Sequence, residues 1–127
     1  MIDIRAAKAT IALYEKHDWK LSRVLLTEET RAEIDASALG LDETADIRDS
    51  DLDAFWFTRR SDPGSEAWEL RRLVGTPFAL VIVVEDAHRE DLEDLLAETE
   101  HRMIETLHRR DLASPNGIKS AETGEKQ

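Results

Sequence analysis

The chain has 127 residues, 41% of them hydrophobic and 35% charged, with a formal net charge of −11; these values fit one soluble domain with its own core. Such an acidic balance disfavours binding to nucleic acid or to anionic membranes and favours a basic protein partner. The absence of cysteine excludes disulfides and thiol chemistry and permits a reducing compartment. The N-terminus lacks the apolar core of a signal peptide, and the longest apolar run, 77–84, is far shorter than the roughly 20 residues that span a bilayer. We therefore expect a cytoplasmic protein, and its composition is typical of bacteria.

The first predicted elements are a helix over 3–17, a strand over 19–27 and a short helix over 27–37. Apolar residues recur at helical spacing in the first segment, and Asp3 is a suitable N-cap. Thr27 is a suitable cap for the second helix, with Thr30 in the place of the usual capping-box glutamate. The stretch 40–52 has many acids and no periodicity, which predicts an acidic loop.

Three strands over 53–60, 66–74 and 78–84 follow, and a long helix over 86–110 with an apolar leucine stripe completes the fold. The short connections between these strands predict an antiparallel meander. We therefore predict an α+β fold: two layers, a mainly antiparallel four-stranded sheet, the order α-β-α-β-β-β-α and a long C-terminal helix. Residues 1–112 are expected to form one domain, and residues 113–127 a disordered polar tail.

The turns between these strands also predict which side chains share a face of the sheet. A turn centred near Pro63 places Phe57 opposite Leu70, and a turn on Gly75-Thr76 places Leu70 opposite Val81. The second face of the sheet then carries apolar side chains that a second copy or a partner could cover. The alternative is that one helix packs on each face and that Trp56 belongs to the core. The candidate partner or self-interface residues are Trp56, Arg71, Phe78, Leu80 and Ile82.

The negative charge is concentrated, because residues 28–53 hold ten Asp or Glu against two arginines. A folded body with one acidic face attracts basic protein surfaces. The candidate partner-binding residues on this face are Asp42, Glu43, Asp46, Asp49, Asp51 and Asp53.

No motif predicts catalysis, a cofactor or a metal site. Residues 49–53 imitate the start of a calcium loop, but Ala54 replaces the required glycine and Arg60 the bidentate glutamate. Glu98 and His101 match a di-iron spacing, yet they lie about half a turn from the apolar stripe of the last helix and should face solvent.

These observations favour a non-catalytic, acidic protein-binding module, such as an immunity-like or inhibitor-like protein that covers a basic partner. One alternative is a small acidic dimeric secretion or folding chaperone. Another is a small-molecule sensor or an enzyme of unknown reaction that uses the crevice between sheet and helix.

Overall fold

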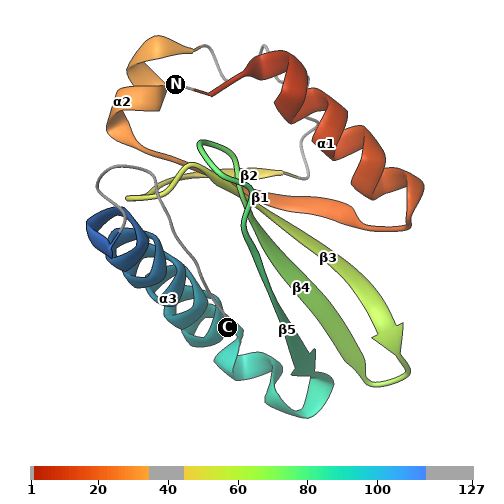
Figure 1. Ribbon diagram of the computed structural model, residues 1–127. Helices are drawn as coiled ribbons and strands as arrows, with labels where there is room; N and C mark the ends of the chain where they lie inside the picture. The colour runs from red at the N-terminus through yellow and green to blue at the C-terminus, as the bar shows by residue number, and fades with distance from the viewer. Residues whose placement is uncertain (1, 35–44, 114–127) are drawn as a thin grey trace.

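A computed structural model describes residues 2–34 and 45–113 of the chain. The elements in chain order are α1 (Ile4–Lys16), β1 (Lys20–Leu26), α2 (Glu28–Glu33), β2 (Asp46–Asp49), β3 (Ala54–Asp62), β4 (Ser65–Arg72), β5 (Ala79–Glu85), the 3₁₀ helix η2 (Asp86–Asp91) and α3 (Leu92–Ala113). The strands form one sheet in the order β2-β1-β3-β4-β5. Figure 1 shows α1 on one side of the sheet and α3 on the other. The predicted α+β class, the mainly antiparallel sheet and the long C-terminal helix are confirmed.

The starts of the first two helices follow the predicted capping chemistry. Asp3 accepts a hydrogen bond from the backbone N–H of Ala6 at 3.1 Å and caps α1. At α2, the Thr27 hydroxyl oxygen accepts from the backbone N–H of Thr30 at 3.2 Å. Each cap satisfies a backbone donor that has no partner within its own helix.

The structure adds a strand that was not predicted, because β2 lies inside the stretch interpreted as an acidic loop. β2 pairs with β1 in parallel, with Val24 opposite Ile47 and Leu26 opposite Asp49. All four residues of β2 are exposed, and three of them are charged. A strand of this composition has no apolar alternation, which explains why its sequence does not indicate a strand.

The predicted register of the first hairpin is wrong by one residue. The structure pairs Trp56 with Leu70 and Thr58 with Trp68. Near the tip, Asp62 pairs with Ser65 as a turn near Pro63 requires, but an irregularity between Arg60 and Asp62 shifts the rest of the ladder. One extra residue in one strand moves every following side chain to the opposite face.

The second hairpin is also shifted by one residue, since Leu70 pairs with Leu80 rather than Val81. Its connection is longer than the predicted two-residue turn: the backbone N–H of Arg72 donates to the carbonyl of Phe78 at 2.9 Å. Gly75 lies inside this loop with a φ of 84°, a conformation that glycine adopts without strain.

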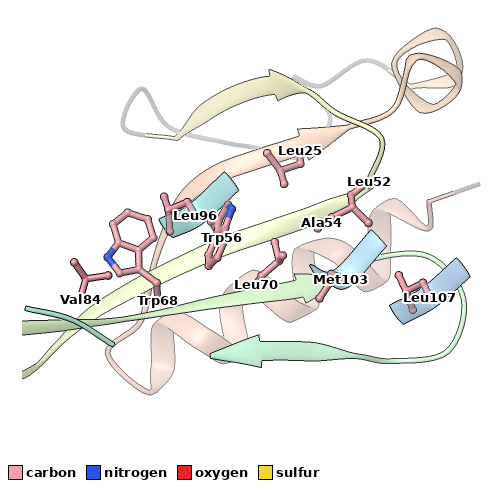
Figure 2. Close-up of a cluster of buried hydrophobic side chains, with 10 residues drawn as sticks. All are labelled: Leu25, Leu52, Ala54, Trp56, Trp68, Leu70, Val84, Leu96, Met103 and Leu107. Atoms are coloured by element: carbon pink, nitrogen blue, oxygen red, sulfur yellow. The ribbon is translucent and has the colours of Figure 1, made fainter. Parts of the chain in front are cut away.

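Two hydrophobic clusters fill the space between the sheet and its helices. The cluster under α3 contains ten buried residues (Figure 2): Leu25, Leu52, Ala54, Trp56, Trp68, Leu70, Val84, Leu96, Met103 and Leu107. The cluster under α1 contains Ile2, Ala7, Tyr14, Leu21, Val24, Leu26, Phe55 and Phe57. The structure thus shows the alternative in which one helix packs on each face, and the domain has three layers rather than the predicted two.

Polar contacts tie the helices to the sheet at the edges of these clusters. Arg23 of β1 is buried and donates to both carboxylate oxygens of Glu93 on α3, at 3.1 and 2.5 Å. Glu93 also lies 3.4 Å from Arg48 of β2. On the other face, the Tyr14 hydroxyl of α1 bonds to Glu69 of β4. These contacts fix the lateral position of each helix over the sheet. Apolar packing alone fixes this position only weakly, because it is non-directional.

Candidate functional site: the acidic edge

The best candidates for a functional site lie at the carboxyl ends of β1 and β2. Because these strands are parallel, their carboxyl ends meet at the same edge of the sheet. β1 passes through Thr27 directly into α2, and the backbone N–H of Ser50, just after β2, donates to the carbonyl of Leu26 at 3.0 Å. The two chain segments are thereby held side by side at this edge.

An open hollow of about 820 Å³ lies between these segments and is lined largely by acids. We call the four acidic residues that line it, Glu28, Glu29, Asp49 and Asp51, the acidic edge. Arg31 is the one basic residue of the lining, and its guanidinium lies 3.4 Å from Asp49. The Asp49 side chain is nevertheless 86% exposed, so the hollow presents its carboxylates to solvent.

The predicted acidic residues divide into three groups in the structure. Asp49 and Asp51 belong to the acidic edge, while Asp42 and Glu43 lie outside the described residues. Asp46 and Asp53 form hydrogen bonds within the fold.

Asp53 holds the start of α2 against the sheet. Its carboxylate accepts hydrogen bonds from the Thr27 backbone N–H at 2.9 Å and from the Thr30 hydroxyl at 2.8 Å. The Thr27 hydroxyl also lies 3.2 Å from the same carboxylate. A carboxylate with these internal donors positions Glu28 and Glu29 rather than binding a partner itself.

Asp46 forms a second internal contact, at the opposite end of β2. It accepts from Nε of Arg48 at 2.7 Å, and Arg48 in turn reaches Glu93 of α3. The hydrogen bond that Arg48 donates to Asp46 is the main cause that raises the pKa of Arg48. These two ion pairs, Asp46–Arg48 and Arg48–Glu93, stabilise the position of β2 beside α3.

Sequence reasoning missed Glu28 and Glu29 as candidate residues. They belong to the acidic segment 28–53, but the sequence predicts a helix start there, with Thr27 as its cap. The missing information was the parallel pairing of β1 and β2, which brings residues 28–29 next to residues 49–51.

The candidate interface residues are mostly part of the core. Trp56 is 0% exposed, and its indole N–H donates to Glu100 at 2.8 Å. Phe78, Leu80 and Ile82 are half-buried against the same cluster. Arg71 lies on the opposite face, where its guanidinium is 5.8 Å from the Tyr14 ring centroid. The structure therefore does not bring these five residues together on one surface.

A smaller crevice of about 310 Å³ lies between the end of the sheet and α3. Its lining includes Asp51, Asp53, Arg72 and His108, with an apolar wall from Leu52 and neighbouring residues. Asp53 is already engaged by the two threonines, and Arg72 donates to the Thr76 carbonyl at 3.3 Å. Asp51 and His108 are the other two ionisable residues of its lining.

No arrangement of three or more potential metal ligands occurs among residues 2–34 and 45–113. In residues 49–53, which resemble the start of a calcium loop, Asp49 faces Arg31 and Asp53 faces α2. Glu98 and His101 are exposed on α3, as predicted. Within the same ranges no helix combines the length and apolar character needed to cross a membrane.

Comparisons with family models, with curated proteins and with solved structures found no match.

Proposed function

We propose that this chain is a non-catalytic cytoplasmic module that binds a basic protein surface through the acidic edge. The observation that carries the proposal is the solvent-open hollow in which Glu28, Glu29, Asp49 and Asp51 face a single arginine. The wider charge balance supports it, since the whole chain carries a formal charge of −11. An inhibitor or immunity protein that covers a cationic toxin is the concrete form of this function.

The physical reasoning concerns both rate and geometry. Concentrated charge steers an oppositely charged partner and raises the association rate, and this effect falls with salt. The hollow adds shape, because carboxylates from two segments surround a space that arginine or lysine side chains can enter. Arginine is the better fit, since its planar guanidinium pairs with carboxylates in a bidentate geometry.

The test compares two charge reversals of equal size. One variant carries Glu28→Lys, Glu29→Lys and Asp51→Lys, and the matched control carries Asp94→Lys, Glu98→Lys and Glu105→Lys on the exposed face of α3. Both variants change the net charge equally, and circular dichroism establishes that both fold. The probe is an oligo-arginine peptide, and its affinity is measured by isothermal titration calorimetry at low and moderate salt.

We expect the acidic-edge variant to weaken peptide binding at least tenfold and the α3 variant to weaken it much less. Amide NMR shifts of the wild-type chain should change most at residues 28–31 and 49–51 on peptide addition. Equal weakening by both variants would show that the peptide senses net charge alone, and the proposed site would then be wrong.

A further inference from the structure

The two edges of the sheet differ sharply in their protection against pairing with another strand. β2 forms one edge, is four residues long and carries Asp46, Arg48 and Asp49. Short, charged edge strands resist pairing with other chains. β5 forms the other edge, is seven residues long and is uncharged from Ala79 to Val84.

The backbone of β5 has free hydrogen-bonding groups along this edge. Arg72 N–H donates to the Phe78 carbonyl, and Asp86 N–H donates to the Gly64 carbonyl, at 2.9 and 2.7 Å. In an antiparallel ladder the bonded residues alternate, so the even-numbered residues of β5 bond to β4. The odd-numbered residues, Ala79, Val81, Val83 and Glu85, therefore direct their N–H and C=O groups away from β4. No backbone hydrogen bond from elsewhere in residues 2–34 and 45–113 reaches them.

The same strand exposes apolar side chains on the face that α1 covers only in part. Val81 is 54% exposed and Val83 is 61% exposed, the highest values among the large hydrophobic residues described. Their neighbours on β4 are Glu69 and Ala67. Free backbone groups and exposed valines on one edge indicate a surface that pairs with a further strand.

We propose that the partner strand is β5 of a second copy of this chain, in an antiparallel pairing with its twofold axis at Ile82. This register overlaps β5 along its full length and pairs Val81 with the partner's Val83. Only odd-numbered residues then exchange hydrogen bonds, as the directions of their backbone groups require. The sheets of the two copies become one continuous sheet with a β2 strand at each end.

Charge favours a second copy in this direction. Arg71 of β4 pairs with Ala79 at the start of β5. Glu85, at the end of β5, lies on the same face of the sheet as Arg71. Antiparallel pairing places the partner's Glu85 beside Ala79, so Arg71, Ala79 and that glutamate form one row across three strands. The small alanine leaves room for the opposite charges to approach. A parallel pairing would instead bring the two copies of Glu85 together, which costs free energy.

The first test measures the mass of the full chain by sedimentation velocity over a range of concentrations. We expect a dimer for wild type and a dissociation constant raised at least tenfold for Val83→Lys. The matched control is Leu13→Lys on α1, where leucine is 53% exposed, and it should remain dimeric. A wild-type chain that stays monomeric at every concentration would overturn the proposal, as would a Val83→Lys variant that remains a dimer.

The second test uses Arg71→Glu and Glu85→Arg, each confirmed as folded by circular dichroism. Each variant alone places like charges across both ends of the pairing and should dissociate. A mixture of the two variants restores opposite charges at both ends, so heterodimers should form. A mixture that stays monomeric while wild type is dimeric would refute this register. These tests are independent of the proposed function, because the acidic edge adjoins β2 at the far side of the sheet.

Discussion

Truncation of Leu70 to alanine tests whether this side chain is tightly packed in the cluster under α3. Leu70 of β4 is 0% exposed, and Figure 2 shows it between Trp56 and Met103. The substitution removes about three carbon groups, worth about 2–2.5 kcal/mol at about 0.8 kcal/mol for each. A residual cavity adds to this cost, although a flexible methionine nearby can fill part of it. We expect a loss of about 2.5–4 kcal/mol in the free energy of unfolding.

The assay is urea denaturation followed by tryptophan fluorescence at one fixed protein concentration, with Leu13→Ala as the control. Leu13 is 53% exposed on α1, and alanine has the higher helix propensity, so the control should change stability by less than about 0.5 kcal/mol. A cost below about 1 kcal/mol for Leu70→Ala would refute the packing argument. A Leu13→Ala cost as large as that of Leu70→Ala would refute it equally.

Three further predictions concern polar groups. The hydrogen bond from Arg23 lowers the pKa of Glu93; the stabilisation it gives is therefore present above the unfolded-state value of 4.5 and lost as the pH falls through the lower folded value. The stability difference between wild type and Glu93→Gln, measured in urea at several pH values, should shrink as the pH falls from 4.5 through the lower folded-state pKa. Burial is the main cause that raises the pKa of Tyr14 above 10.0, and since this is the one tyrosine, an absorbance titration should show it ionising at higher pH in the folded chain than in urea. Asp53→Ala should cost about 1–3 kcal/mol in urea denaturation because the part-buried donors of Thr27 and Thr30 lose their acceptor, whereas Asp51→Ala should cost less than about 0.5 kcal/mol.

Local signals in the sequence were sufficient to predict most of the fold. Asp3 and Thr27 were predicted as helix caps and act as such, because capping depends on residues within one turn. The strands β3, β4 and β5 carry strong apolar patterns, and their positions were predicted within about two residues. The long final helix was also predicted, although its first six residues, 86–91, form the 3₁₀ helix η2 and α3 begins at Leu92. These features depend on short-range chemistry that a single sequence displays.

The errors arose where one residue, or a distant contact, decides the outcome. The irregularity between Arg60 and Asp62 shifts the β3–β4 ladder, and nothing in the turn sequence indicates it. Because side chains alternate along a strand, this single shift places Trp56 on the same face as Leu70 and Trp68. Trp56 lies in the core rather than at an interface because a helix covers each face of the sheet. The acidic edge depended on the parallel pairing of β2, which is a long-range contact without apolar alternation.

The chemical difference between the two edges of the sheet implies different responses to salt. Binding at the acidic edge would rest on exposed carboxylates, whose attraction for a basic partner is screened within about 10 Å at 0.1 M salt. Pairing through β5 would rest on backbone hydrogen bonds and on Val81 and Val83, and salt screens neither. Rising salt should therefore release an oligo-arginine peptide while leaving a β5 dimer largely assembled, apart from the contribution of Arg71 and Glu85. The dimer would also carry two acidic edges at opposite ends of one sheet, so that each copy binds a basic surface without hindering the other. Loss of peptide binding and of dimerisation at the same salt concentration would contradict these different responses and indicate that charge alone governs association.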